Sequence, residues 1–274
     1  MTTSATIETV VAKERRLLAE LQELPAVIVA LSGGTDSAYL AWAARQALGE
    51  RALSVTAVSA SLPASERREV ESFVRRHSIT HEFIRTEELA NPLYVVNSPD
   101  RCYHCKDELF TRLDQLARQR GIAAVAYGVN LDDQGDFRPG QQAAREHRVL
   151  TPLLDAGLSK AEIRELSRRA NLETWDKPAA ACLASRIAHG VEVTEENLKQ
   201  VEQGEAALRA LGFRKVRARY HGELVRIEIA ADELPRALTP EMTQKFAEIF
   251  KGLGFKFVTL DLEGYRQGSF NPSL

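Results

Sequence analysis

Ser32-Gly-Gly-Thr-Asp36-Ser37 is the stretch that decides the fold of this chain of 274 residues. An apolar run at 26–31 precedes it and a helix-like segment at 38–45 follows it, which is the order strand, tight turn and helix. Two adjacent glycines let the backbone turn sharply and approach a ligand closely. The N–H groups that open the helix, together with the hydroxyls of Ser32 and Ser37, then face one small anion. The Gly-Lys-Ser/Thr ending of a Walker-type loop is absent from this stretch.

The six residues resemble the PP-loop of the ATP pyrophosphatases, which split ATP into AMP and pyrophosphate. An ordinary strand-to-helix turn is the alternative, and the complete pattern in this context favours the PP-loop. The resemblance implies a nucleotide site in which Asp36 orients a metal ion or a phosphate. The residues assigned to this site are Ser32, Gly33, Gly34, Thr35, Asp36 and Ser37.

Composition limits the class of protein. Apolar residues make up 44%, enough for sizeable cores, and the length allows one large domain or two. The net charge of −2 does not indicate a nucleic-acid partner. No apolar run approaches the roughly 20 residues of a membrane span, and the first residues lack the basic and apolar regions of a signal peptide. We therefore expect a cytoplasmic protein with no membrane or nucleic-acid partner.

Strand-like and helix-like segments alternate through most of the chain. Strands are expected at 26–31, 53–59, 80–85 and 123–127, and helices at 5–23, 38–45, 64–77 and 106–120. This alternation predicts an α/β fold with a parallel sheet. In such sheets ligands lie beyond the carboxyl ends of the strands, where the loops at 32–37 and 128–133 fall.

The pattern changes after about residue 195. Helices are expected at 197–211 and 241–252, a hairpin at 216–220 and 224–229, and a last strand at 255–260. The hairpin alternates apolar and polar residues, so one of its faces is covered. We therefore predict a PP-loop domain at 1–190 and a small α+β domain at 191–274, which would serve substrate binding and oligomerisation.

The loop that begins at Gly128 is rich in carboxylates, because Asp132, Asp133 and Asp136 lie within five residues. One interpretation is that Mg²⁺ bridges these oxygens and the phosphates of ATP. The other is a solvated turn, which Asp and Gly favour. Since the loop follows a strand in a chain that also carries SGGTDS, we prefer a nucleotide site that includes Gly128, Asp132 and Asp133.

The chain has three cysteines, of which Cys102 and Cys105 form a CxxC pair. The pair could be redox-active or half of a metal site. A redox pair usually opens a helix in a thioredoxin-like unit, and the sequence shows no such unit. Together with Cys182, the pair could hold a [4Fe–4S] cluster with one iron that lacks a protein ligand. Zinc completed by His104 or by water is the main alternative, and three unconnected thiols are another.

Two further groups of residues are candidates for the site. Cys182 lies among small residues, which leave room for a bulky partner, and Arg186 would favour its thiolate if the two were close. A packed, alanine-rich turn is the alternative. Arg217 and Arg219 share one face of a strand, and paired guanidinium groups suit a phosphate. A solvated strand face is equally compatible with the spacing.

Taken together, the motifs resemble the LarE family of ATP-dependent sulfur transferases, which make the organic part of a nickel-pincer cofactor. The resemblance runs almost from end to end, over 32–37, 101–106, 128–140, 177–187, 216–229 and 261–269.

The resemblance implies that the enzyme adenylates a carboxylate of pyridinium-3,5-biscarboxylic acid mononucleotide and replaces an oxygen by sulfur, twice. In one branch of the family a single cysteine is sacrificed. In another, three cysteines hold a [4Fe–4S] cluster. Cys102, Cys105 and Cys182 place this chain with the cluster-using branch. By resemblance, Arg217 and Arg219 hold the substrate phosphate, and the protein assembles as trimers or hexamers.

Three other functions remain as alternatives. A tRNA thiolase would add zinc-binding cysteines or a basic region, and neither is evident here. A ligase that uses ammonia, of the NAD- or GMP-synthetase type, would not need three cysteines. A nucleotide-binding regulator without catalysis would release no pyrophosphate, so stoichiometric pyrophosphate release discriminates it from an enzyme.

Overall fold

The computed structural model describes residues 3–134, 139–178 and 181–266. Contacts between backbone positions divide the chain into two compact units. The first unit contains Met1–Glu87 and Cys102–Ala180, and the second contains Glu88–Arg101 and Ala181–Leu274. As functional domains, the limits of 1–190 and 191–274 stay a prediction.

Four parallel strands form the sheet of the first unit. Their order across the sheet is β3 (His81–Arg85), β2 (Ala52–Val58), β1 (Val27–Ala30) and β4 (Ala124–Tyr127). Val27 of β1 aligns with Ala52 on one side and Ala124 on the other. All four residues of β1 are buried, as expected for a central parallel strand with helices on both faces. The carboxyl end of β1 therefore points the following loop out of the middle of the sheet.

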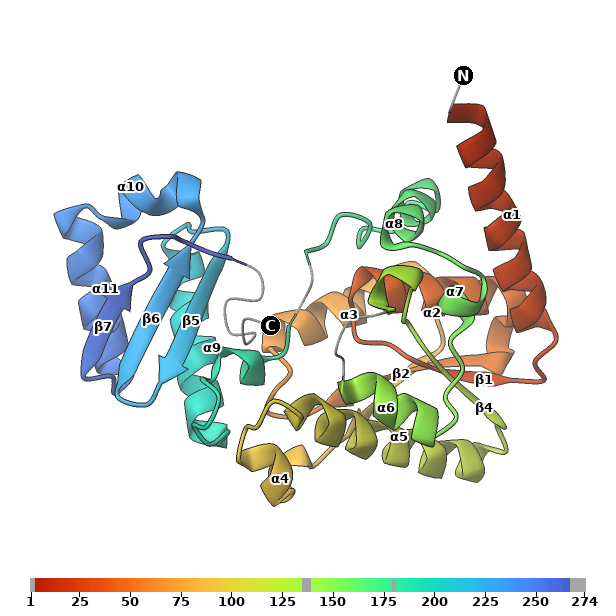
Figure 1. Cartoon of the computed structure of the whole chain (residues 1–274), viewed down its shortest axis with the longest axis horizontal. Helices are drawn as coiled ribbons and strands as arrows, with labels where there is room; N and C mark the ends of the chain where they lie inside the picture. Colours follow the sequence, from red (N-terminus) through yellow and green to blue (C-terminus); the bar gives the residue numbers. More distant parts are fainter. Residues whose placement is uncertain (1–2, 135–138, 179–180, 267–274) are drawn as a thin grey trace. The chain divides into compact units, whose positions relative to one another are not determined.

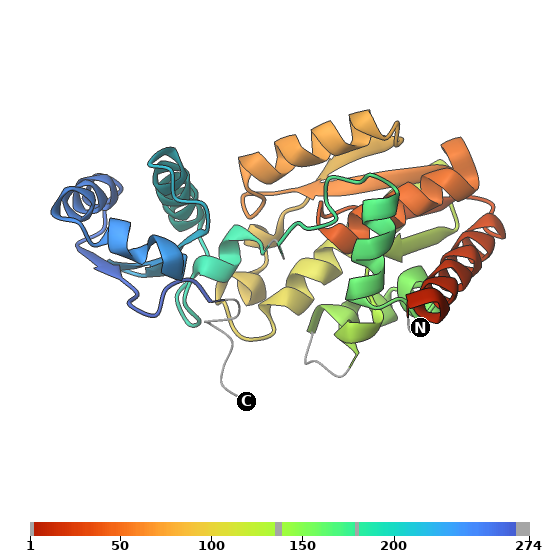
Figure 2. The same cartoon turned by 90° about the horizontal axis from the view of Figure 1, so that it is seen from above.

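Helices cover both faces of this sheet, and each face has its own apolar core (Figure 1). One face carries α1 (Thr3–Gln22), α2 (Thr35–Leu48), α3 (Ala64–Arg76), α7 (Pro152–Asp155) and α8 (Lys160–Arg169). The other carries α5 (Arg101–Arg120) and α6 (Pro139–Glu146). Figure 2 shows the same unit from above, with α1 and α8 in front of the sheet.

The helix expected at 106–120 begins five residues earlier, at Arg101, and this corrects the expected start. Cys, Tyr and His have modest helix propensities, so the sequence pattern became helical only at Lys106. In the structure the helix extends to Arg101, because Tyr103 packs against the apolar core between α5 and the sheet. The CxxC pair therefore lies in the first turn of α5, the position that a redox pair would also occupy.

The second unit is built on a three-stranded sheet in the order β5 (Val216–His221), β6 (Leu224–Ile229) and β7 (Phe257–Leu260). The first two strands form the expected antiparallel hairpin, and β7 is parallel to β6. Apolar residues of this sheet pack with helices α9 (Glu195–Ala210), α10 (Leu234–Ala237) and α11 (Pro240–Gly252). The unit also contains the short helix α4 (Pro92–Val95).

The predicted fold class is confirmed: the chain is α/β, with a four-stranded parallel sheet and a smaller C-terminal sheet. The four strands and the helices expected in the first unit are all present within two residues of the expected bounds, apart from the start of α5 and the wider extent of α2. No helix in the described part of the chain is both long enough and apolar enough to cross a membrane.

Candidate functional site

The SGGTDS loop connects the end of β1 to the start of α2 and closes on itself through its two serines. The backbone N–H of Ser32 donates to Oγ of Ser37 at 3.1 Å, and the two hydroxyl oxygens lie 2.9 Å apart. Gly33 has φ +80°, and a Cβ there would meet Cγ2 of Val70 at 2.8 Å. This position therefore requires glycine for both its backbone conformation and its packing. No side chain of the described residues caps the amino end of α2, so its N–H groups can receive a negatively charged ligand.

Thr35 is buried, and its side chain faces the protein interior. Its hydroxyl donates to the backbone carbonyl of Thr174 at 2.8 Å. Of the loop residues that the sequence assigned to nucleotide binding, Thr35 can therefore offer its backbone to a ligand, while its side chain anchors the loop.

Asp36 lies in the first turn of α2 and forms an ion pair with Lys160. The Nζ atom of Lys160 donates to Oδ2 of Asp36 at 2.7 Å. The Oδ1 atom of Asp36 is buried and has no hydrogen-bond partner among the residues that the structure describes. Buried carboxylate oxygens are normally satisfied, so this atom is available to a ligand that is not part of the chain.

The acidic loop is organised as a capped turn. The side chain of Asn130 accepts from the backbone N–H of Asp132, and Oδ2 of Asp133 accepts from the backbone N–H of Asn130 at 3.0 Å. Oδ2 of Asp132 accepts from the backbone N–H of Lys160 at 2.8 Å. Asp133 thus closes the turn, and Asp132 connects it to the start of α8. Asp136 lies outside the described residues.

Gly128 opens the acidic loop and packs against the start of α2. A Cβ at this position would lie 2.7 Å from the backbone nitrogen of Ser37 and 2.9 Å from the carbonyl carbon of Asp36. Glycine therefore allows the end of β4 to approach the PP-loop, and this brings the two predicted parts of the nucleotide site together within the first unit.

Two of the three cysteines lie on α5. Cys102 is exposed and Cys105 is half-buried, and their spacing of three residues places them on one face of the helix. Gly140 at the start of α6 packs against this turn, because a Cβ there would meet Cγ of Lys106 at 2.8 Å. Within the described residues of each unit, no three Cys, His, Asp or Glu side chains gather around one point as metal ligands.

Cys182 belongs to the second unit and is also exposed. It precedes a short 3₁₀ helix, Leu183–Arg186, whose last residue holds its backbone. Nη1 of Arg186 donates to the carbonyl of Cys182 at 2.9 Å, and Nε donates to Oε1 of Glu205 at 2.9 Å. Burial opposes ionisation of Glu205, but the pairing with Arg186 outweighs it and lowers the pKa of this carboxyl. Arg186 thus orients the cysteine segment by its backbone.

Arg101 and Asn97 also hold this segment. Arg101, the residue before Cys102, donates to the carbonyl of Ala184 at 2.9 Å and to Oδ1 of Asn97. The side-chain amide of Asn97 donates to the carbonyls of Ala188 and Val191 at 2.8 and 2.9 Å. The residue that precedes the CxxC pair is therefore bonded to the backbone two residues after Cys182.

The predicted arginine pair divides into two different environments. Arg219 is buried and pairs with Oε2 of the fully buried Glu228 at 2.9 Å. Arg217 is half-buried and stacks on the ring of Tyr265, with its guanidinium carbon 5.1 Å from the ring centre. Burial and the neighbouring charge of Arg186 lower the pKa of Arg217. An anion beside Arg217 would relieve this crowding of positive charge.

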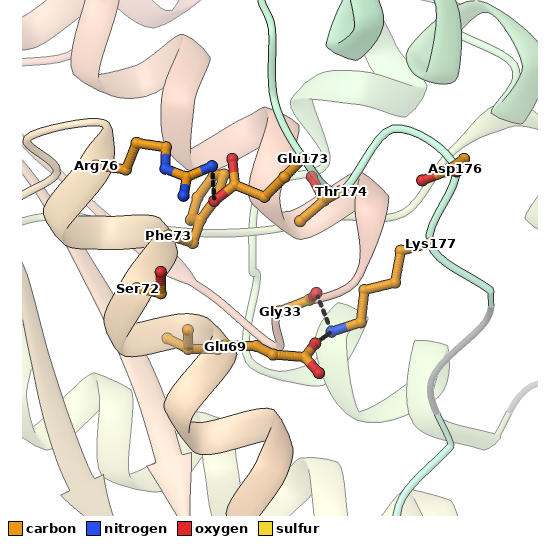
Figure 3. Close-up of a pocket in the computed structure, with 10 residues that line it drawn as sticks. Gly33, Glu69, Ser72, Phe73, Arg76, Glu173, Thr174, Asp176 and Lys177 are labelled. Carbon is orange, nitrogen blue, oxygen red and sulfur yellow. Dashed lines mark hydrogen bonds and ion pairs between the residues drawn. The ribbon is translucent and has the colours of Figure 1, made fainter. Parts of the chain in front are cut away.

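A cavity of about 430 Å³ lies beside Gly33, between α3 and the segment 173–177 (Figure 3). Val70 and Phe73 contribute apolar surface, and Glu69, Arg76, Glu173, Asp176 and Lys177 contribute charges. Lys177 bonds to the carbonyl of Gly33 at 3.1 Å and pairs with Glu66 and Glu69 at 2.5 and 2.7 Å.

Sequence reasoning missed four residues that organise the site: Arg101, Lys160, Lys177 and Glu205. Lys160 follows Ser159 at the start of α8, in a capping box closed by Glu162. The Ser-x-x-Glu pattern at 159–162 could have placed this helix, and with it a lysine at a helix start. Lys177 and Arg101 lie in the motifs at 177–187 and 101–106, in which the cysteines are the residues with recognisable chemistry. Nothing in the sequence indicated the partner of Glu205.

The parallel sheet with SGGTDS at the carboxyl end of β1 defines a PP-loop α/β protein. No family model matches the chain. It is 34% identical to the pyridinium-3,5-bisthiocarboxylic acid mononucleotide synthase of Lactiplantibacillus plantarum, over 97% of this chain and 96% of that protein. It is also 41% identical to an uncharacterized protein of Synechocystis sp., over 92% of this chain and 94% of that protein. The chain belongs to the LarE family, which confirms the family expected from the six motifs.

Proposed function

We propose that this protein is an ATP-dependent sulfur transferase that acts on pyridinium-3,5-biscarboxylic acid mononucleotide. It would adenylate the carboxylates with release of pyrophosphate and convert them to thiocarboxylates. The synthase of Lactiplantibacillus plantarum is named for the bisthiocarboxylic acid product, and this chain matches it along nearly its whole length. The observation that carries the proposal is the open, glycine-lined start of α2 with the unsatisfied Oδ1 atom of Asp36 beside it.

The chemistry explains why ATP is needed. A carboxylate is a poor electrophile because its leaving group would be oxide. Its oxygen therefore attacks the α-phosphorus of ATP, the bond to the bridging oxygen breaks, and pyrophosphate departs. Sulfur then attacks the acyl carbon of the acyl adenylate, and AMP leaves with the former carboxylate oxygen. In this scheme the N–H groups at the start of α2 hold the departing phosphates.

Asp36 fits the metal ion that such a reaction requires. One of its oxygens is buried without a partner among the described residues, and carboxylate oxygens are the preferred ligands of Mg²⁺. Mg²⁺ bound with ATP would spread the charge of the phosphates. Asp132 and Asp133 instead accept backbone N–H groups, so their contribution would be to shape the loop.

The cysteines fit a [4Fe–4S] cluster by their chemistry and accessibility. Cys102 and Cys105 present two thiols from one face of a helix start, and Cys182 is an exposed third thiol. We propose that these three residues hold the cluster, which would supply the sulfur atom. The hydrogen bond from Arg101 to the carbonyl of Ala184 supports this, because it ties the residue before Cys102 to the segment of Cys182.

Sulfur transfer from Cys182 itself is the second candidate, and the exposure of this residue favours it. Its sulfur would attack the acyl carbon as AMP leaves. Loss of the Cα proton and cleavage of the Cβ–S bond would then leave the thiocarboxylate and a dehydroalanine. This route consumes one protein chain for each sulfur atom transferred, whereas a cluster that is resupplied with sulfide would allow repeated turnover.

The test is an assay of protein purified without oxygen and mixed with ATP, Mg²⁺ and the mononucleotide. We expect AMP and pyrophosphate only when the mononucleotide is present, and a product in which sulfur has replaced oxygen. The Asp36→Asn variant keeps the shape of the side chain and removes its charge, so it should fold and release no pyrophosphate. Formation of ADP and orthophosphate, or pyrophosphate release that requires tRNA instead of the mononucleotide, would overturn the proposal.

A further inference from the structure

Lys177 makes an unusual set of contacts directly behind the PP-loop. Its Nζ atom donates to the carbonyl of Gly33 at 3.1 Å and lies 2.7 Å from Glu69 on α3 (Figure 3). It also lies 2.5 Å from Glu66 on the same helix. A backbone carbonyl of the PP-loop is thus held by a charged donor from a segment more than one hundred residues away, since 144 positions separate the two residues.

The charge of Lys177 is fully engaged by its partners. Burial lowers the pKa of this lysine, but the hydrogen bonds and charges of Glu66 and Glu69 outweigh burial, so that its pKa is raised. Two carboxylates beside one ammonium leave a net negative charge here. Glu173 and Asp176 add two further negative charges to the cavity, and Arg76 offsets only one of them. An anionic phosphate is therefore disfavoured on this side of the loop. Lys177 does not act as the phosphate ligand.

The geometry of the peptide group assigns Lys177 a different role. In a trans peptide the C=O of one residue and the N–H of the next point in opposite directions. Because Lys177 holds the carbonyl of Gly33, the N–H of Gly34 is directed away from Lys177 and its carboxylates. Within the described residues this N–H makes no hydrogen bond.

A second tie fixes the same loop to the same segment. The hydroxyl of Thr35 donates to the carbonyl of Thr174, which also accepts from the backbone N–H of Lys177 at 3.2 Å. The turn from Thr174 to Lys177 therefore holds the PP-loop at the carbonyl of Gly33 and at the side chain of Thr35. A glycine pair has many accessible backbone conformations, so an external brace is needed to keep a single one.

We infer that Lys177 is a positioning residue that orients the Gly33–Gly34 peptide so that the N–H of Gly34 donates to the departing pyrophosphate. This inference rests on the proposed function and adds a residue to it. A preorganised backbone donor requires no reorientation when charge develops on the leaving group, and this is the main source of such stabilisation.

The test compares Lys177→Met with the wild-type protein by calorimetric titration with magnesium pyrophosphate and, separately, with AMP. The methionine keeps the length of the side chain and removes the donor. We expect the dissociation constant for pyrophosphate to rise about tenfold, the effect of one hydrogen bond, while that for AMP stays within twofold. The kcat for pyrophosphate release should fall, with little change in KM for the mononucleotide.

Lys13→Met is the matched control, because it removes another partly buried lysine–glutamate pair of the same unit, with Glu162.

Equal weakening of pyrophosphate and AMP, or unchanged pyrophosphate binding in a folded Lys177→Met variant, would overturn the inference. If the two carboxylates left facing each other prevent folding, the double variant Lys177→Met/Glu69→Gln relieves their repulsion, and the same comparison decides. A wild-type protein that neither binds nor releases pyrophosphate would instead overturn the proposed function.

Discussion

The ammonium of Lys160 lies 2.7 Å from the carboxylate of Asp36, although 124 residues separate them in the chain. The backbone N–H of the same lysine donates to Asp132 at 2.8 Å. One residue at the start of α8 therefore connects the loop after β1 to the loop after β4. These two strands are neighbours in the sheet, so the connection lies across the end of the sheet where ligands bind.

We predict that Lys160→Met increases the affinity of the nucleotide-free protein for Mg²⁺ and decreases the rate of pyrophosphate release. Lys160 neutralises Asp36 when no metal ion is bound, so its removal leaves this carboxylate without a competing cation. The affinity for Mg²⁺ should rise roughly tenfold, the worth of one charged hydrogen bond. Titration calorimetry with MgCl₂ measures the first effect, and a pyrophosphate assay measures the second.

The variant Asp36→Asn serves as the control for this prediction, because it should lose the affinity for Mg²⁺ altogether. Lys160 would have no role as a counter-charge if Lys160→Met bound Mg²⁺ with unchanged affinity.

A second prediction separates the two arginines that the sequence treated as a pair. Arg219→Met removes one of the two arginine partners of the fully buried Glu228 and leaves Arg226, which lies 3.2 Å from the same carboxylate. It should lower the free energy of unfolding by about 2 kcal/mol, the worth of one charged hydrogen bond. If Arg217 holds the substrate phosphate, as the resemblance implies, Arg217→Met should leave stability nearly unchanged and raise KM for the mononucleotide roughly tenfold, the effect of losing one charged hydrogen bond. Urea unfolding and steady-state kinetics measure the two effects.

The double variant Arg219→Met/Glu228→Gln is the control for the stability effect. It removes the buried carboxylate charge together with that of Arg219 and should recover part of the lost stability. Equal losses of stability in Arg217→Met and Arg219→Met would contradict this assignment.

The third prediction concerns pH and the support of the PP-loop by His81. Nε2 of His81 lies 2.9 Å from Oγ1 of Thr56, which donates to the carbonyl of Leu31 at 2.7 Å. This hydroxyl uses its one proton toward Leu31, so His81 is the donor to Thr56. Burial lowers the pKa of His81 to about 4 from the ordinary value of 6.5, although Glu71 opposes the shift. The folded protein therefore favours the neutral form of the His81 ring.

The sign of the pH effect follows from linkage between protonation and folding. Between the ordinary pKa and the lowered one, the unfolded chain binds the proton and the folded chain does not. The stabilisation is therefore complete above pH 6.5 and is lost as the pH falls toward 4. His81→Gln keeps a donor for Thr56 and cannot titrate, so its unfolding free energy should depend less on pH in this window. Urea unfolding at several pH values tests this prediction. The control is His189→Gln, because His189 is exposed. Identical dependence of the unfolding free energy on pH in the wild type and in His81→Gln would refute the prediction.

The elements of the site that depend on local sequence could be predicted. The backbone conformation at position 33 requires glycine, and the SGGTDS loop lies between a buried strand and a helix. Both features can be recognised from residues that follow one another in the sequence. The hairpin of the second unit is local in the same way. The start of α5 was placed wrongly because the packing of Tyr103, and not its helix propensity, extends the helix to Arg101.

Contacts between distant segments could not be predicted. Lys160 with Asp36, Lys177 with Gly33 and Arg186 with Glu205 each join residues whose positions in the chain carry no sign of their partner. A lysine or glutamate on a helix is usually solvated, so a single sequence gives no reason to bury it. The Arg217–Arg219 spacing predicted a shared strand face correctly, but only the opposing Glu228 shows that one of the two is engaged in the protein interior.

The last prediction concerns the three cysteines and the metal that they would hold. Cys102→Ala, Cys105→Ala and Cys182→Ala should each lose bound iron, broad visible absorption and sulfur transfer, while pyrophosphate release persists at least in part. The reason is that, in the proposed mechanism, adenylation uses the PP-loop of the first unit, whereas thiolate ligands are needed only for sulfur delivery. Iron analysis, absorption spectra and the pyrophosphate assay on protein purified without oxygen provide the measurements.

Arg101 extends this last prediction to a residue that is not a ligand. It is buried, precedes Cys102 and donates to the carbonyl of Ala184, two residues after Cys182. Arg101→Met should therefore lower the iron content while the three thiols remain, whereas Arg214→Met, at an exposed ion pair with Asp232, should not.

Stoichiometric zinc without iron would contradict the cluster. Full activity of Cys102→Ala and Cys105→Ala beside an inactive Cys182→Ala would establish Cys182 as the sulfur donor, and mass spectrometry after turnover would then show the chain lighter by the mass of H₂S.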